Sequence, residues 1–471
     1  MSENKYVKRF LNPASIWAII WALFQIWIVF RGSFSALVLR PIHVGFAIGL
    51  VFLTQPMFKK NKVPKGQKYM PKWYEYIFVA LDLMCIIHMC VNSERIMSRM
   101  VGLDALTTMD IVVGVVLILL LLECSRRAVN MALTIIVLVF LAYGFFGNML
   151  PGLLGHTGHS LSAMLENQVY STGGIFGSPV SVSVSMVFYF LLFGAFLSAT
   201  PAGQLFINIS NLLTRKTTGG AGKATVGACA FFGMISGSAP ANVASVGTIM
   251  YPSLKKEKFD PTFSGSILAI GGTAGQLIPP VMGAAAFIMV DMDGTSYSQV
   301  MLSAILPSII FMMAMYFLVH FYAKKHHLSA PVMDVTQVKK DIMKHLHLLL
   351  SIVVLVAMIL SGRSMMRAAT LSAVVLIVLT MIRKDTRLNL FTFLETLEST
   401  AKQAVIVVMP CALAGIIVGE IVSTGLGLRF SSMINMVAQN FLLIALMLTM
   451  LMALILGMGM PTSAAYIMAA T

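Results

Sequence analysis

Charge is scarce in this chain. Only 11% of its 471 residues are Asp, Glu, Lys or Arg, whereas soluble domains are about 25% charged. Hydrophobic residues make up 58% of the sequence, and the mean hydropathy is +0.87. This composition excludes an ordinary soluble domain and predicts an all-α polytopic membrane protein.

Acidic residues are especially few, with 18 against 33 basic residues and a net charge of +15. The Lys and Arg residues fall in short loops between apolar segments, which is typical of cytoplasmic loops in membrane proteins. The charge therefore indicates a lipid bilayer as partner and no nucleic acid. The five cysteines are scattered through apolar segments without the spacing of a metal site, so we expect small buried side chains and no metal centre there.

Enzyme motifs are also missing. The sequence has no His-Glu-x-x-His and no Gly-x-Ser-x-Gly. Residues 220–225 resemble a phosphate-binding loop only faintly, because Thr217 replaces its first Gly and Ala224 its Ser or Thr. We expect no enzyme activity, no cofactor and no ATP hydrolysis, so any uptake would use an ion gradient or another subunit.

The charges of the loops predict how the apolar segments are threaded. Placing the Lys- and Arg-rich loops in the cytoplasm puts the N-terminus inside and residues 150–184, which contain no Lys or Arg, outside. The threading works only if residues 221–254 enter and leave on the cytoplasmic side. The expected spans are 14–30, 40–58, 75–93, 109–123, 129–149, 185–206, 263–289, 300–322, 343–361, 366–382, 400–423 and 441–471.

The segment Phe232–Thr248 is rich in Gly, Ser, Pro and Asn inside an apolar run. A broken helix survives in a membrane only where protein or a water-filled cavity surrounds it. We therefore predict a re-entrant hairpin over 221–254, made of two half-helices and a polar tip. Ser245 and Thr248 are expected to bond their own helix. The candidate substrate- or ion-binding residues of the tip are Ser236, Gly237, Ser238, Pro240 and Asn242.

The end of the chain resembles this hairpin. Residues 457–466 again place Gly, Pro, Thr and Ser inside an apolar run, and Gly203 and Gly425 end a span at a similar distance before each tip. The threading gives the two units opposite orientations, which is typical of inverted-repeat secondary transporters with a site at the repeat interface. Chance similarity is the alternative. The second tip contributes the candidates Gly459, Pro461, Thr462 and Ser463.

A third break is expected inside 263–289, where Gly271-Gly272 and Pro279-Pro280 should unwind the helix. Thr273 and Gln276 would then face a cavity or another helix. The alternative is a packing face made by Gly271 and Gly275, as we also expect for Gly45 and Gly49.

These elements suggest a chemistry for the site. Half-helix N-termini suit a carboxylate, whereas half-helix C-termini and unwound carbonyls suit a monovalent cation such as Na⁺. Without a carboxylate at the tips, a divalent-metal site is not expected.

Acidic residues inside the spans have separate interpretations. Glu420 lies within a span, so it is either functional or reaches water at the helix end. Asp82, His88, Asp110 and Glu123 are interpreted as packing or interfacial groups.

The predicted organisation has four parts. Residues 1–127 form an N-terminal four-helix region, and 128–323 form a first repeat with the hairpin and the unwound helix. Residues 324–342 form a cytoplasmic loop, and 343–471 form an incomplete second repeat.

Residues 170–330 resemble the permease of a tripartite ATP-independent periplasmic (TRAP) transporter, of the fused type that pairs with TAXI solute-binding proteins. The resemblance rests on residues 174–177, 192–196, 233–242 and 275–289, and 457–462 fits the second hairpin. It implies an inner-membrane, elevator-type permease that imports an organic acid from a periplasmic binding protein by symport with Na⁺ or H⁺. The implied ion and substrate sites are Ser236–Asn242, Thr273–Gln276 and Met460–Ser463.

Two departures from the family matter. Where its members often carry an acidic residue before Gly203, this chain has Ser198-Ala-Thr-Pro, which puts an ion-pair role there in doubt. The chain also ends at Thr471 within the second hairpin, whereas the family continues, so we expect a truncated chain that does not transport alone. The alternatives are a cation/dicarboxylate symporter without a binding protein, a channel, and a non-functional remnant.

Overall fold

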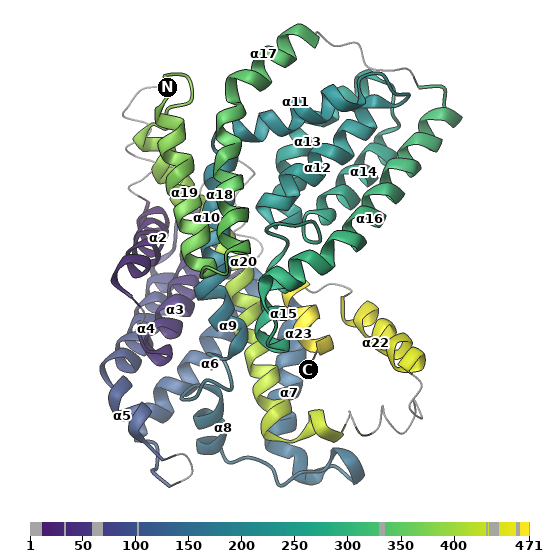
Figure 1. Ribbon diagram of the computed structural model, residues 1–471. Helices are drawn as coiled ribbons and strands as arrows, with labels where there is room; N and C mark the ends of the chain where they lie inside the picture. Colours follow the sequence, from purple (N-terminus) through teal and green to yellow (C-terminus); the bar gives the residue numbers. More distant parts are fainter. Residues whose placement is uncertain are drawn as a thin grey trace. The chain divides into compact units, whose positions relative to one another are not determined.

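The computed structural model describes residues 12–32, 34–58, 69–100, 103–328, 335–429, 432, 442–457 and 462–470. Within these ranges the regular elements are helices, and no strand occurs (Figure 1). Nine of the described helices are long and apolar enough to cross a bilayer, which confirms the all-α polytopic fold class. They are Pro13–Arg31, Ala36–Thr54, Trp73–Val91, Thr108–Ala128, Met131–Met149, Ser178–Ser198, Tyr297–Lys325, Val335–Leu360 and Leu390–Ser423.

Contacts divide the chain into two compact units. The first unit combines Met1–Ser185 with Ala401–Thr471, and the second is Met186–Thr400. This division follows compactness and does not coincide with the predicted repeat boundaries, which stay a prediction.

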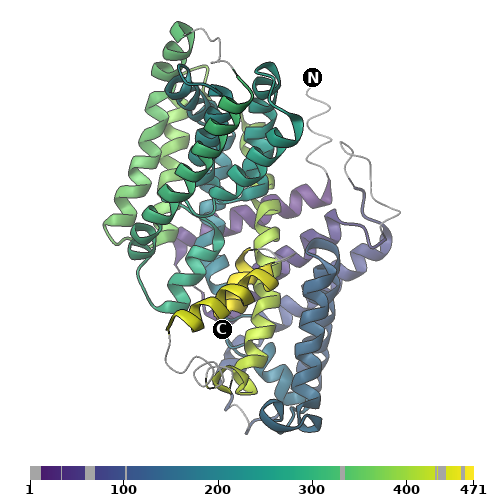
Figure 2. The same cartoon turned by 90° about the vertical axis from the view of Figure 1, so that its right-hand side faces the viewer.

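The first unit contains the N-terminal helices and the end of the chain. The two C-terminal helices pack on each other and are yellow in Figure 2. Its elements are α2 (Pro13–Arg31), α3 (Ala36–Thr54), α4 (Trp73–Val91), α5 (Ser93–Ser98), α6 (Thr108–Ala128), α7 (Met131–Phe146), η2 (Gly147–Met149), η3 (Gly152–Leu154), α8 (Leu161–Gln168), α9 (Ser178–Val182), the part of α20 (Leu390–Ser423) from Ala401 on, α22 (Leu442–Gly457) and α23 (Thr462–Ala470).

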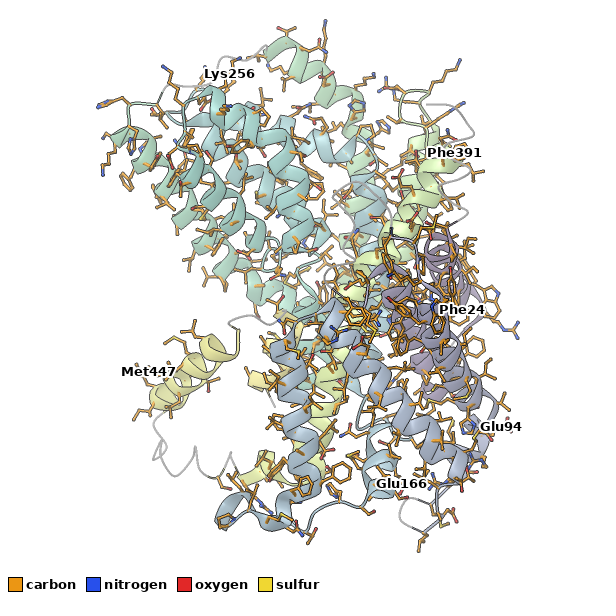
Figure 3. The ribbon with its side chains drawn as sticks, turned by 180° about the vertical axis from the view of Figure 1, so that it is seen from behind. Phe24, Glu94, Glu166, Lys256, Phe391 and Met447 are labelled. Carbon is orange, nitrogen blue, oxygen red and sulfur yellow. The ribbon has the colours of Figure 1, made fainter. Side chains whose placement is uncertain are left out.

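Helix α3 is central among the N-terminal helices because its glycines admit neighbours closely. A Cβ added at Gly45 would lie 2.0 Å from Ile86 Cδ1 of α4, and one at Gly49 would lie 2.6 Å from the Trp17 ring of α2. This confirms the predicted Gly45–Gly49 packing face. Aromatic rings fill the same interface, where Phe24 lies 6.0 Å from the Phe46 ring (Figure 3).

Two clusters of ion pairs in the first unit confirm the packing interpretation of Asp110 and Glu123. Asp110 is fully buried and accepts hydrogen bonds from Arg95 at 2.6 Å and from His88 at 2.8 Å. Arg127 has no exposed side-chain surface, and its guanidinium reaches Glu123 at 2.7 Å. Both acids are thus neutralised within the fold.

Asp82 on α4 is also fully buried, but neither of its carboxylate oxygens has a hydrogen-bond partner among the described residues. Burying an unsatisfied polar group costs about 1–3 kcal/mol. We expect Asp82→Leu to raise the free energy of unfolding by about 1–3 kcal/mol, measured as thermal unfolding in detergent. The matched variant Asp110→Leu removes a paired carboxylate and should lower stability instead; equal shifts in one direction would contradict this reading.

The second unit contains α10 (Phe188–Ser198), α11 (Ala202–Thr214), α12 (Gly220–Ser236), α13 (Ala239–Lys256), α14 (Pro261–Ala274), α15 (Ala284–Asp293), α16 (Tyr297–Lys325), α17 (Val335–His345), η5 (Leu346–Leu349), α18 (Leu350–Leu360), α19 (Met365–Met381) and the start of α20. Helices α12, α13 and α14 pack on one another, and α16 packs on α12 and α14 (Figure 1). Lys223 of α12 is 2% exposed, and its Nζ lies 3.1 Å from His320 Nδ1 of α16.

Two predicted boundaries are wrong. The span expected at 185 begins at Ser178, because polar serines there find partners: Ser185 donates to Ser181 O at 2.7 Å, and Ser183 Oγ lies 3.2 Å from His43 Nε2 of α3. The loop expected over 324–342 contains α17, whose Val335, Val338 and Ile342 recur at helical spacing on an otherwise charged segment. Neither the start at Ser178 nor helix α17 coincides with a continuous apolar run in the sequence.

Candidate functional site

The first polar tip lies between two helices of the second unit. Helix α12 ends at Ser236, and Gly237 follows with φ 58°, a left-handed conformation that favours glycine. Ser238 then precedes α13, whose second residue is Pro240. Pro is tolerated in a first helical turn because the N–H that it lacks has no partner within the helix there. The predicted break therefore falls at residues 237–238.

Asn242 holds the hairpin to the neighbouring helix. Its side chain is fully buried, and Nδ2 lies 2.9 Å from Cys229 O of α12 and 3.2 Å from Gly272 O of α14. Its Oδ1 is buried without a hydrogen-bond partner among the described residues. One amide thus bridges three helices and leaves one acceptor unused.

Helix α14 ends at Ala274, and the chain is not regularly helical again until Ala284. Pro279 and Pro280 lack the N–H groups that a continuing helix would need. This segment lies against the tip: Val281 N donates to Met234 O at 3.1 Å, and Gly233 and Gly275 meet backbone to backbone. A Cβ added at Gly275 would lie 2.4 Å from Gly233 Cα. The unwound segment therefore packs on the last turns of α12, and it also reaches the break, because a Cβ added at Gly237 would lie 2.2 Å from Met282 O.

The hydroxyl and amide candidates around these breaks differ in their surroundings. Ser236 is buried, Ser238 is half-buried and Pro240 is exposed. Thr273 is exposed and donates to Ile270 O at 2.7 Å within its own helix, whereas Gln276 is half-buried and its carbonyl accepts from Gly283 N at 2.8 Å. Thr248 donates to Ser245 O at 2.9 Å, which confirms that its hydroxyl bonds its own helix.

Two residues that the sequence did not single out fix the unwound segment. The Tyr297 hydroxyl lies 2.9 Å from Pro280 O and 2.5 Å from Val281 O. The Ser308 hydroxyl lies 3.0 Å from Leu277 O. Both side chains come from α16, so local sequence carries no signal for them beyond the need to satisfy freed carbonyls.

The candidates of the second tip belong to the first unit. Gly459 and Pro461 lie outside the described residues. Thr462 begins α23 with an exposed side chain, and Ser463 beside it is 4% exposed. Whether the two tips form one site stays a prediction.

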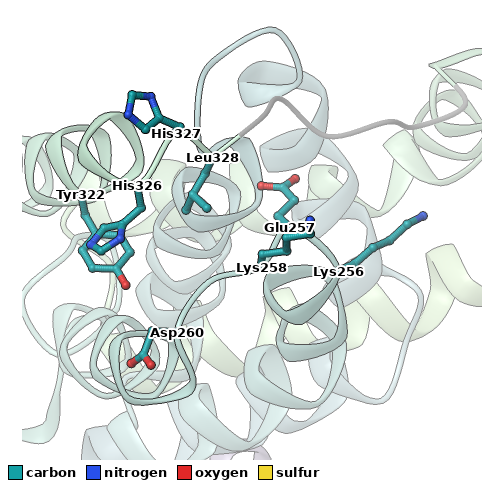
Figure 4. Close-up of a pocket in the computed structure, with 8 residues that line it drawn as sticks. All are labelled: Lys256, Glu257, Lys258, Asp260, Tyr322, His326, His327 and Leu328. Carbon is teal, nitrogen blue, oxygen red and sulfur yellow. The ribbon is translucent and has the colours of Figure 1, made fainter.

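A hollow of about 670 Å³ lies at the other end of the hairpin, where α13 turns into α14 and α16 ends (Figure 4). Its two acids cap helices: Glu257 accepts from Ala221 N and Asp260 from Phe263 N, both at 3.0 Å. Figure 4 shows Lys256 extending away from the other labelled side chains. The arrangement explains how the hairpin is anchored and does not resemble a substrate site.

In the first unit, a hollow of about 610 Å³ follows α7. His156 lines this hollow. Its Nε2 lies 3.0 Å from Tyr143 O, and its Nδ1 accepts from Gly158 N at 3.0 Å. His159 Nε2 is buried without a partner among the described residues, and burial and the neighbouring His156 lower the pKa of His159. Neutral His159 is therefore favoured.

The lowered pKa of His159 predicts a pH dependence. Residues 155–160 bind fewer protons when folded around His159 than when this loop unfolds. The stability that His159 contributes is therefore present at neutral pH and is lost as pH falls below the ordinary value of 6.5. We expect faster hydrogen exchange at residues 155–160 at acidic pH, after correction for intrinsic rates. His159→Asn should flatten this dependence; an unchanged dependence in the variant would contradict the assignment.

The fold defines a multi-spanning helical membrane protein in which a broken helical hairpin packs on an unwound helix. A family model, "Tripartite ATP-independent periplasmic transporter, DctM component", matches residues 116–471. The chain belongs to this family, as its sequence motifs suggested, and the family comprises transporter permeases rather than enzymes.

Individual relatives match over shorter regions. An isethionate TRAP transporter permease, DctMQ of Oleidesulfovibrio alaskensis, is 28% identical over 34% of this chain and 25% of its own length. A C4-dicarboxylate large permease, DctM of Pseudomonas aeruginosa, is 28% identical over 37% and 40%. The sialic acid large permease SiaM of Vibrio cholerae is 24% identical over 47% and 52%. The chain thus matches between a quarter and about half of the length of these relatives.

Proposed function

We propose that this protein is the membrane permease of a binding-protein-dependent secondary transporter. The observation that carries the proposal is the contact between the Gly237–Ser238 break and the 275–283 break, where a Cβ added at Gly237 would lie 2.2 Å from Met282 O, in a chain that belongs to a permease family. Broken helices at membrane depth supply unused backbone groups for ions and anionic solutes. The substrate class is an organic acid, coupled to a gradient of Na⁺ or H⁺.

The proposal includes an inner-membrane location with a cytoplasmic N-terminus, and a periplasmic solute-binding protein of the TAXI type as partner. The basic loops support this orientation. The relative named DctMQ supports a fused arrangement, in which residues 1–127 correspond to a small subunit. The elevator mechanism and the substrate-binding roles of the two tips belong to the same proposal.

Uptake in proteoliposomes tests the function. The chain is reconstituted with and without a TAXI-type binding protein, and uptake of labelled C4-dicarboxylates and other small acids is measured under imposed Na⁺ or pH gradients. We expect uptake only with both the binding protein and a gradient, and such uptake would overturn the expectation from the sequence that this chain does not transport. Uptake without the binding protein would favour a lone symporter. No uptake in any arm would contradict the proposal and favour a non-transporting chain.

A further inference from the structure

The first unit buries a pair of polar side chains that belong to neither hairpin tip. Glu420 of α20 and Gln168 of α8 are both fully buried. Gln168 Nε2 donates to Glu420 Oε1 at 2.8 Å and to Ile416 O at 3.1 Å. The alternative expected from the sequence, that Glu420 reaches water at its helix end, is wrong, because its side chain has no exposed surface.

Two hydrogen-bond acceptors of this pair lack a donor among the described residues. Both N–H groups of the Gln168 amide are used, while Gln168 Oε1 and Glu420 Oε2 are buried without a partner among the described residues. Turning the amide over would bring its oxygen against Ile416 O and replace a hydrogen bond with a repulsion. Two orphaned acceptors on two adjoining groups call for an added donor.

Glycines close the space around the pair. A Cβ added at Gly144 of α7 would lie 2.2 Å from Glu420 Oε2, and one at Gly419 would lie 2.9 Å from Gln168 Nε2. A Cβ at Gly174 would lie 2.6 Å from Gln168 Oε1. Backbone therefore packs directly against the two side chains.

Among the described residues, no basic group pairs with Glu420. The ion pairs between described residues of this unit join Arg95 and His88 with Asp110, Arg99 with Glu166, and Arg126 and Arg127 with Glu123 or Glu75. Titratable groups on the elements around the pair include His156 and His159 after α7, Glu166 on α8 and Cys411 on α20. Arg429, beyond α20, donates to Gly155 O. An ionised carboxylate in such surroundings carries a large desolvation cost.

We infer that Glu420 is an intramembrane proton-binding site, in which a proton on Oε2 makes the carboxyl group neutral and turns the pair with Gln168 into a carboxylic acid–amide pair. The proton supplies the missing donor, and Gln168 Oε1 is an acceptor of the right chemistry. A role for this proton as the coupling ion rests on the proposed function. The binding of the proton to Glu420 does not depend on that function.

Infrared spectroscopy of the full chain in detergent tests the site without any substrate. The wild-type protein at neutral pH should show the carbonyl stretch of a protonated carboxyl group, shifted in D₂O, and Glu420→Gln should lose that band. Gln keeps the shape of the side chain and its hydrogen bonding to Gln168 but cannot release a proton. Asp82→Asn is the matched control, because it should remove a separate band and leave that of Glu420.

A second measurement covers the case in which Glu420→Gln does not fold. Wild-type protein labelled with ¹³C at the glutamate carboxyl should show the band displaced by the label, whereas aspartate labelling should not displace it. Absence of a glutamate-derived band overturns the proposal. A second outcome would also overturn the proposal. If the band is absent, if Na⁺ raises the melting temperature, and if Glu420→Gln abolishes that stabilisation, the residue belongs to a sodium site instead. Failure of transport would leave both infrared results unaffected.

Discussion

Gly275→Ala should destabilise the protein by about 2–3 kcal/mol, although it adds only one methyl group. The new Cβ would lie 2.4 Å from Gly233 Cα and 2.9 Å from Gly233 C, and backbone atoms cannot rotate away as a side chain would. The backbone at Gly275 has φ −59°, which alanine adopts freely, so the contact alone causes the loss. Thermal unfolding in detergent measures it.

Gly265 on the preceding helix provides the matched control. A Cβ at Gly265 meets nothing within 4 Å, and the residue lies inside α14. Gly265→Ala should therefore stabilise the protein by about 0.5–1 kcal/mol, since alanine restricts the unfolded chain and favours helix. If the two variants melt alike, the close approach of the hairpin to the unwound segment is not what holds this unit.

Asn242→Leu should cost about 2–4 kcal/mol, because it removes the donors to two buried carbonyls and keeps a similar side-chain volume. Those carbonyls belong to Cys229 and Gly272, on different helices. Asn242→Asp should cost more, since a carboxylate would face the same carbonyl oxygens with no donor. The melting temperature and the fraction of monodisperse protein report both losses.

Thr248→Val is the control on the same helix. Thr248 is exposed, and its hydroxyl bonds only Ser245 O of its own helix, so the change should stay within about 0.5 kcal/mol. A loss at Asn242 no larger than that at Thr248 would show that the amide does not bridge the helices. Uptake lost in an Asn242 variant of normal stability would instead place Asn242 in the binding site itself.

The hairpin and the unwound helix could be predicted from sequence because Gly, Pro and Ser act locally on the backbone. The end of α12 at Gly237 and the end of α14 before Pro279 follow from residues next to the break. The Gly45–Gly49 packing face is equally local, since small residues at helical spacing admit any neighbour.

Other features depend on residues distant in sequence, and composition carries no trace of them. Tyr297 and Ser308 satisfy carbonyls 17 and 31 residues earlier in the chain. Glu420 lies three residues before Ser423, the last residue of α20, and its packing against Gly144 and Gln168 buries it. The amphipathic helix α17 is not predicted by continuous apolar segments, because its apolar residues recur at helical spacing on one face.

The meeting of Gly233 and Gly275 also limits how this protein can be engineered. Each position is small because the other is there, so no single substitution relieves the constraint, and a paired change would need the backbone to move apart. A saturation library should therefore find both positions intolerant together, while Gly265, ten residues before Gly275, accepts many side chains. Designers who wish to attach a spectroscopic label to this unit should choose the helix surface around Gly265 and leave the glycine pair untouched.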